Sequence, residues 1–182
     1  MLLNVNQIIG DDCFLEVMEL AGELSLFNSV MLQKQAVNEI LKINEVTRQY
    51  GLTLTLKQAV DLVETRSFAL QHTGRIEIGG GMIDKLITAF ASSAFLTSYD
   101  YAETLNDLIE LFYYYKNETL DQVSDDDLIR FMEKAFNGVC KGSFELLAGR
   151  ELVRMAHNIR FGHAMDYEEK ENAEEEEHNE LY

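Results

Sequence analysis

Apolar residues recur every three or four positions along most of this chain, which is the spacing of amphipathic α-helices. One such stripe is formed by Leu32, Ala36, Ile40 and Ile43, with charged residues on the opposite side. Comparable stripes predict helices over about 13–24, 28–50, 55–71, 82–95, 97–116, 124–138 and 143–162. We therefore expect an all-α fold, a compact bundle of about six or seven helices held together by helix-on-helix burial.

The segment 65–90 interrupts this helical pattern. Residues Arg75 to Ile78 alternate polar and apolar side chains, which is the period of a half-buried strand. The best available partner for such a strand is the N-terminal arm around Leu3 and Val5. We expect at most a short two-stranded β element near residues 75–78, followed by a glycine turn and a new helix.

Several helix ends carry recognisable capping residues. Thr55 and Gln58 form a capping box, in which each side chain satisfies a free backbone N–H group. Ser124 precedes three aspartates, which favour the positive end of a helix dipole. Gly51 stands where a left-handed residue closes the preceding helix.

The chain has 182 residues, a length typical of one domain with its own core. No linker-like break occurs before the C-terminus, so we expect a single helical domain over residues 1–164. Residues 165–182 are a low-complexity acidic run and predict a disordered tail.

The charge balance limits the classes of partner. The formal net charge is −17, and residues 166–182 contribute nine acidic residues and one lysine to it. The rest of the chain is therefore acidic too. Nucleic acids and anionic membranes attract clustered Lys and Arg, so we expect neither as a partner.

The location predicted for the protein is the cytoplasm. The N-terminus has no basic segment followed by an apolar core, as a signal peptide would, and no apolar run approaches a bilayer-spanning length. Cys13 and Cys140 lie far apart without metal-ligand spacing, which favours two buried thiols in a reducing compartment.

A first candidate site is a small-anion site in the segment 66–84. Arginine side chains can bind carboxylate or phosphate, a histidine can exchange a proton, and a glycine turn before a helix exposes backbone N–H groups. The alternative is a purely structural turn held by Arg–Glu or Arg–Asp pairs. The candidate residues are Arg66, His72, Arg75, Gly79, Gly80 and Gly81.

A second candidate is a partner-docking surface. The aromatic run from Phe112 to Tyr115 wraps more than one helix face, so some of its tyrosine hydroxyls should reach water or a partner. A basic stripe on the last helix stands out on an acidic protein, although it also fits a solvated face or one neutralised by the acidic tail. The candidate residues are Tyr113, Tyr114, Arg150, Arg154 and His157.

No metal, cofactor or catalytic motif is expected. His157 and His163 are six residues apart, which does not place them on one helix face. The glycine turn has neither the spacing of a phosphate-binding P-loop nor that of a dinucleotide fingerprint. The aspartates near 121–127 do not match a calcium-binding loop.

Three stretches carry a resemblance to a known family. They are TRSFALQHTGRIEIGGGMIDKLI (Thr65–Ile87), YYYKNET (Tyr113–Thr119) and SDDDLIRFM (Ser124–Met132). Together they resemble a family of uncharacterised proteins from Gram-positive, clostridia-type bacteria, over most of the chain before the tail. The resemblance implies a bacterial cytoplasmic protein of unknown function and assigns no catalytic residues.

Two functional hypotheses follow. The first is a non-catalytic interaction or regulatory protein that binds another protein or itself through the tyrosine and arginine surfaces. The second is a protein or enzyme that binds a small phosphate or carboxylate at the Arg66–Gly81 segment.

Overall fold

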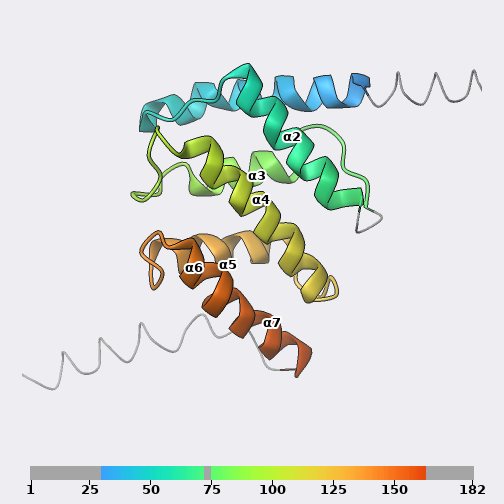
Figure 1. Cartoon of the computed structure of the whole chain (residues 1–182), viewed down its shortest axis with the longest axis vertical. Coiled ribbons are helices and arrows are strands. Elements are labelled where there is room, and N and C mark those ends of the chain that lie inside the picture. The colour runs from blue at the N-terminus through green and yellow to red at the C-terminus, as the bar shows by residue number, and fades with distance from the viewer. Residues whose placement is uncertain (1–29, 72–74, 163–182) are drawn as a thin grey trace, which may run out of the picture.

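The described residues fold as helices joined by short connections. A computed structural model describes residues 30–71 and 75–162 (Figure 1). The all-α prediction is confirmed, and no strand occurs in these two ranges. The elements are a first helix at 30–47, η2 (Arg48–Tyr50), α2 (Leu56–Gln71), α3 (Met82–Phe90), α4 (Tyr101–Glu118), α5 (Asp125–Asn137), α6 (Phe144–Leu146), the π-helical segment η3 (Leu147–Glu151) and α7 (Leu152–Arg160).

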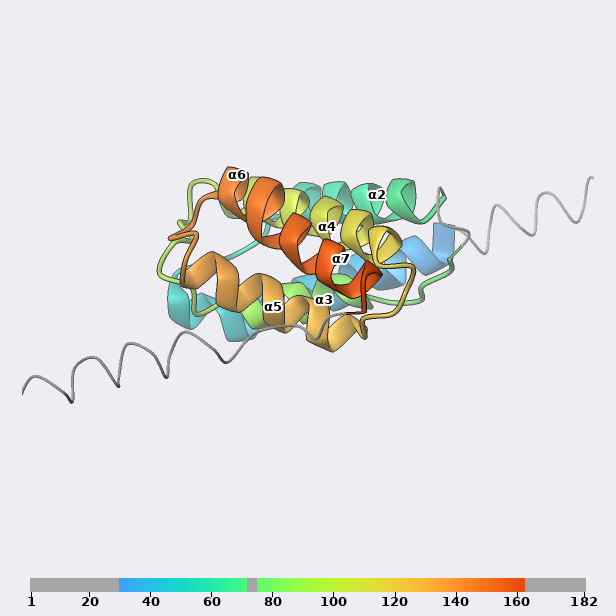
Figure 2. The same cartoon turned by 90° about the horizontal axis from the view of Figure 1, so that it is seen from below.

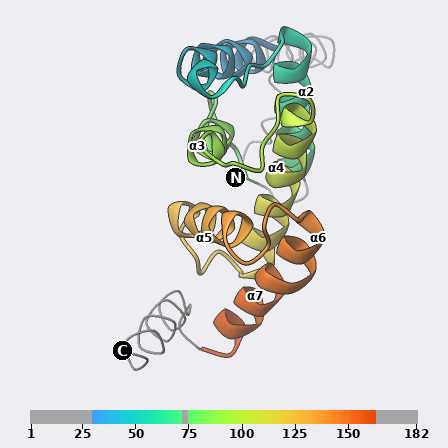
Figure 3. The same cartoon turned by 90° about the vertical axis from the view of Figure 1, so that its left-hand side faces the viewer.

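The helices are arranged in two rows. Figure 3 shows α2, α4 and α6 along one side and α3 and α5 along the other, and Figure 2 shows the same division from a second direction. Helix α2 packs on α4, α3 packs on α4 and α5, and α7 packs on α4. Helix α4 therefore contacts both rows, and the core lies around it.

Helix α4 is buried on all but one narrow side. Leu105, Leu108, Ile109 and Phe112 have no solvent exposure. Each such side chain contributes about 1.5–3 kcal/mol of burial free energy before the entropy cost of folding. The exposed side chains of α4 are spaced four and three residues apart and form one stripe, Glu103, Asp107, Glu110, Tyr114 and Asn117.

The predicted helix caps are confirmed. The Thr55 N–H donates to Gln58 Oε1 at 2.8 Å, and the Gln58 N–H donates to Thr55 Oγ1 at 3.3 Å, which is the reciprocal pattern of a capping box. Ser124 Oγ accepts the Asp127 N–H at 3.1 Å. Gly51 has φ 74° and closes η2, as its position predicted.

Two helices differ from their predicted form. Helix α3 ends at Phe90 rather than near 95, because buried Ser93 donates to Asn137 Oδ1 and accepts the Phe95 N–H, which turns the chain. The last helix is not uniform, because η3 inserts a π-helical stretch between α6 and α7. Tyr115 Oη donates to the Ala148 carbonyl within that stretch.

Residues 75–78 form neither a helix nor a strand, and no strand partner for them lies among the described residues. The proposed partner around Leu3 and Val5, the predicted helix at 13–24 and the tail at 165–182 lie outside those residues.

None of the helices in the described ranges has the length and apolar character needed to cross a membrane.

Replacing the N-cap of α5 should measurably destabilise the protein. We expect Ser124→Ala to lower the free energy of unfolding by about 1 kcal/mol, because the Asp127 N–H loses its acceptor. Ser124→Asn, which keeps a capping oxygen without adding charge, should stay within a few tenths of a kcal/mol of the native protein. Urea denaturation of the three proteins measures the difference; equal losses for both variants would contradict the capping role.

Candidate functional site

The side chain of Arg66 connects α2 to the glycine turn. Arg66 is only 4% exposed, and its Nη1 donates to the carbonyl oxygens of Gly79 at 2.6 Å and Gly80 at 3.1 Å. Its Nε is buried and has no hydrogen-bond partner. Arg66, Gly79 and Gly80 are thus brought together from positions 13 and 14 residues apart.

The backbone N–H groups of the turn are used internally. The Gly80 N–H donates to Glu39 Oε2 at 2.6 Å, and the Met82 N–H donates to Glu77 Oε2 at 3.3 Å. Hydrogen bonds from Gln35 and from Gly80 hold the pKa of Glu39 below its usual value. A free anion at this turn would compete with these two carboxylates, and anion binding here stays a prediction.

Two glycines of the turn have backbone angles that favour glycine. Gly79 has φ 69° and Gly81 has φ 54°, both in the region that side chains rarely adopt. A Cβ atom at Gly81 would also lie 3.0 Å from Glu77 Oε2. The chain therefore needs glycine here to bring Glu77 and Arg66 close to the backbone.

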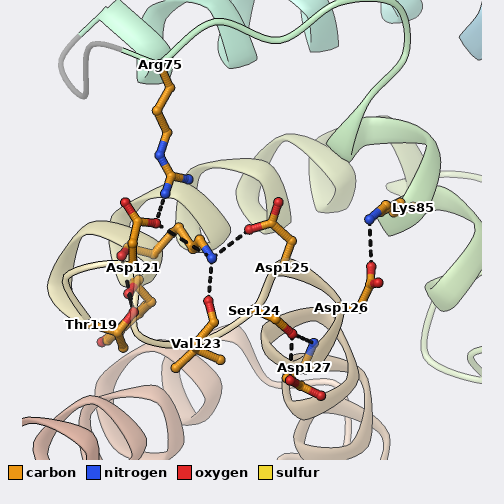
Figure 4. A network of polar contacts seen from close by, with 11 residues as sticks. Arg75, Lys85, Thr119, Asp121, Val123, Ser124, Asp125, Asp126 and Asp127 are labelled. Carbon is orange, nitrogen blue, oxygen red and sulfur yellow. Dashed lines mark hydrogen bonds and ion pairs between the residues drawn. The ribbon is translucent and has the colours of Figure 1, made fainter.

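Arg75 does not join this group. It forms an ion pair with Asp121 in the connection between α4 and α5 (Figure 4). His72 lies outside the described residues. The structure therefore groups Arg66 with the glycines and places Arg75 in a different network.

That second network supports a strained connection. Leu120 and Asp121 have φ 51° and 60°, which is unusual for residues with side chains. Lys116, only 6% exposed, donates to the Val123 carbonyl and lies 2.7 Å from Asp125 Oδ1. Arg75 and Lys116 thus neutralise the carboxylates of the connection, which is a structural role.

Two further polar groups lie close to the Arg66 turn. Asp84 Oδ1 is buried without a hydrogen-bond partner, and burial followed by the charge of Glu39 raises the pKa of Asp84. Tyr113 is 2% exposed and its hydroxyl has no partner, so it faces the core rather than solvent. Burial and then the charge of Glu77 raise the pKa of Tyr113.

The basic stripe of the last helix, with Arg150 in η3 and Arg154 and His157 in α7, is on the surface, and its arginines are already paired. Arg150 Nε lies 3.1 Å and Arg154 Nη2 lies 2.7 Å from carboxylate oxygens of Glu151, which is itself buried. Arg160 pairs with Glu118 on α4 at 2.8 Å. The exposed ring of His157 packs on Phe161 with a centroid distance of 4.5 Å.

An open groove of about 610 Å³ lies between α4 and the start of the last helix. Carboxylates and aromatic side chains line it together, and Tyr114 is 58% exposed at its edge. The π-helical stretch contributes one wall, and such stretches occur frequently at functional sites. The lining residues are Asp107, Glu110, Leu111, Tyr114, Tyr115, Phe144, Glu145 and Ala148.

A second hollow of about 610 Å³ adjoins the first and shares Glu110 with it. It lies between α2 and α4, where Phe68 is 67% exposed beside Glu64. No Lys, Arg or His is among the described residues that line either hollow. We call the surface formed by the two hollows the acidic groove.

The electrostatics of the acidic groove are one-sided. Burial and then the charges of Glu110 and Glu103 raise the pKa of Asp107, so its charged neighbours repel its ionised form. Asp126 on α5 shows the opposite shift. The ammonium of Lys85, 2.6 Å from Asp126 Oδ1, holds the pKa of the Asp126 carboxyl below its usual value.

The sequence analysis found Tyr114 but missed the rest of the acidic groove. A signal for part of it exists, since Glu103, Asp107, Glu110 and Tyr114 follow helical spacing between the apolar positions of α4. Phe68 and Phe144 carry no such signal, because only the packing of α2 and α6 beside α4 brings them there.

Across residues 30–71 and 75–162, no group of three or more His, Cys, Asp or Glu residues is arranged to hold a metal ion. Cys140 is buried, and burial followed by the charge of Glu151 raises the pKa of its thiol. Such a thiol is less reactive than an exposed one.

These observations define an all-helical protein with an acidic, aromatic groove and with an arginine–glycine turn whose Gly80 and Met82 N–H groups donate to the chain's own carboxylates. The chain belongs to a family of unknown function, DUF6323, whose model matches residues 39–165. No curated protein and no solved structure matches the chain.

Removing the Arg66 guanidinium should destabilise the fold strongly. We expect Arg66→Met to lower the free energy of unfolding by about 2–3 kcal/mol, because two buried carbonyls lose a charged donor. Arg130→Met is the matched control: Arg130 is exposed and, among the described residues, forms its ion pair with Asp127, so the loss should stay below about 1 kcal/mol. Chemical denaturation measures both, and similar losses would contradict the role given to Arg66.

The Asp84 carboxyl should make stability depend on pH. Its ordinary pKa is 3.8 and the folded state raises it, so the fold favours the protonated form. Below 3.8 the group is neutral in both states; as the pH rises through the folded-state pKa, ionisation destabilises the fold. The gain in unfolding free energy on Asp84→Asn should therefore grow with pH from acid toward neutral and then level off.

Asp126→Asn is the control of opposite sign, because Lys85 lowers the pKa of Asp126. That variant should lose stability relative to the native protein as the pH rises through the same acid range. Denaturation curves between acid and neutral pH measure the change in unfolding free energy for both variants. An effect of Asp84→Asn that does not vary with pH would contradict the raised pKa of Asp84.

Proposed function

We propose that this chain is a non-catalytic interaction protein that binds a protein partner in the acidic groove. The observation that supports this function best is the exposed stripe of α4, where Asp107, Glu110 and Tyr114 line a hollow whose described lining includes no Lys, Arg or His. Exposed aromatic rings mark surfaces that a partner can cover, and charge of one sign beside them favours a partner of complementary charge.

The composition of the groove fits a docking surface. Exposed Tyr114 and Phe68 offer large, rather rigid apolar area, which is the residue type enriched at the centre of protein interfaces. The adjoining hollows are open rather than enclosed, so they suit a protruding helix or loop more than a small molecule that must be surrounded.

The basic stripe of the last helix is a second proposed docking face. Arg150, Arg154 and His157 are exposed, and the two arginines share one buried carboxylate, Glu151. A partner contacting them would bind at the rim of an existing ion pair, where a charge affects the rate of association more than the affinity.

The resemblance to proteins of clostridia-type bacteria supports a bacterial cytoplasmic setting for this interaction. The acidic balance of the chain argues against nucleic acid and anionic membranes as the partner, since both carry negative charge.

Position-specific photocrosslinking in the producing cells tests the proposal. We expect benzoylphenylalanine at position 114 to give a discrete protein adduct under ultraviolet light, because Tyr114 lies in the groove. Tyr50, which is 50% exposed in η2 and lines neither hollow, is the matched control position and should give none. The adduct should disappear on Glu110→Lys; equal adducts at both positions, or none at 114, would refute docking in the groove.

A further inference from the structure

We infer that the acidic groove receives an amphipathic helix of a different protein, with lysines or arginines beside its apolar face. This inference rests on the proposed function and specifies the chemistry of the partner. Three observations support it: the unpaired carboxylates, the shape of the groove, and the internal pairing of the chain's own basic stripe.

The first observation is the absence of counter-charges at the groove. Some described carboxylates outside the groove are paired with cations: Asp126 with Lys85, Asp127 with Arg130 and Glu118 with Arg160. Asp107 and Glu110 form no ion pair with any residue in the described ranges, and the charged neighbours that raise the pKa of Asp107 are themselves acidic. A bound cation would relieve this repulsion, whereas an anionic partner would increase it.

The second observation is the geometry. Side chains of α4 form one wall of the groove, and Phe144, Glu145 and Ala148 at the start of the last helix form the other. A third helix can lay its apolar ridge between two such walls. The stripe from Glu103 to Tyr114 spans about 16 Å at 1.5 Å per residue, so a partner helix of about three turns covers it.

The apolar and charged positions of the groove fit this arrangement. Leu111, Tyr114 and Phe144 form its apolar floor and edge, and Asp107, Glu110 and Glu145 stand beside them. Side chains at i, i+3, i+4 and i+7 of a bound helix would meet the apolar groups, while flanking basic residues would meet the carboxylates.

The third observation concerns the identity of the partner. The chain's own basic stripe could fill an acidic groove of a second copy, but Arg150 and Arg154 are held by Glu151, and Arg160 is held by Glu118. Self-docking would have to break or share these pairs. A different protein whose lysines or arginines are not already paired avoids that cost. We therefore assign the groove to a helix of a different protein.

Binding of model peptides to the full-length protein tests the inference. The probe is a fluorescein-labelled, amidated peptide of about 14 residues, long enough for about four helical turns, with leucines at helical spacing and lysines between them. Two companion peptides replace every lysine by glutamine or by glutamate. Fluorescence anisotropy should show that the lysine peptide binds at least about tenfold more tightly than the glutamine peptide, a difference of about 1.4 kcal/mol.

Two charge-reversed variants separate docking from general attraction to an acidic protein. Glu110→Lys lies in the groove, and Glu45→Lys makes the same change in net charge on the exposed side of the first helix. We expect the first to weaken binding of the lysine peptide about tenfold and the second to change it less than about twofold. Equal weakening by both would overturn the inference, because the acidic tail and net charge would then explain the binding.

Other outcomes distinguish this inference from the proposed function. If the glutamine peptide binds as tightly as the lysine peptide and Tyr114→Ala abolishes the binding of both peptides, the groove is a docking site. The inference that its partner carries basic residues is then wrong. If light scattering shows a dimer that Glu110→Lys dissociates, the occupant is a second copy and the assignment to a different protein is wrong. If no peptide binds and position 114 gives no crosslink, both the inference and the proposed function fail.

Discussion

The burial of α4 is the constraint on which the rest of this structure depends. A helix that contacts α2, α3, α5 and α7 must be apolar around most of its circumference, and the side chains of Leu105, Leu108, Ile109 and Phe112 meet that requirement. One narrow side is left for polar residues. Few residues of α4 reach solvent on that side, and most of them are acidic, with one tyrosine among them. These residues therefore determine the charge and the aromatic content of the surface along this row of helices.

The Arg66 turn shows how a sequence can carry the features of an anion site and use them for its own fold. A buried guanidinium, a glycine turn and a helix start are present, yet the carboxylates that meet the backbone N–H groups come from Glu39 and Glu77. Buried charges persist when such partners compensate their loss of water. The turn, which leads into α3, is joined to the first helix by Glu39 and to α2 by Arg66.

Helix caps, which depend on neighbouring residues, were predictable from the sequence. Contacts between residues far apart in the chain were not. Thr55, Ser124 and Gly51 act through neighbours within a few residues, so their roles could be inferred from spacing. The contact of Arg66 with Gly79, and of Phe144 with the α4 stripe, depend on how helices pack, which periodicity does not encode.

Two apolar residues that continue the helical spacing lie outside the core because they stand at helix ends. Leu56 is 63% exposed because it is the first residue of α2, and Val139 is 54% exposed because α5 has already ended at Asn137. Both residues fit the apolar stripe by spacing, but helical geometry no longer directs a side chain inward beyond the end of the helix.

The π-helical stretch sets the rotational phase between the two halves of the last helix. Phe144 and Ala148, which face the groove, lie at or before the widened turn, whereas Arg154 and His157 follow it. Each residue of an α-helix advances the rotation by about 100°. Deleting one residue from Leu147–Glu151 would therefore turn the arginine stripe by roughly a quarter of a circle relative to the groove, so insertions and deletions here are a route by which related chains could redirect one surface without altering the other.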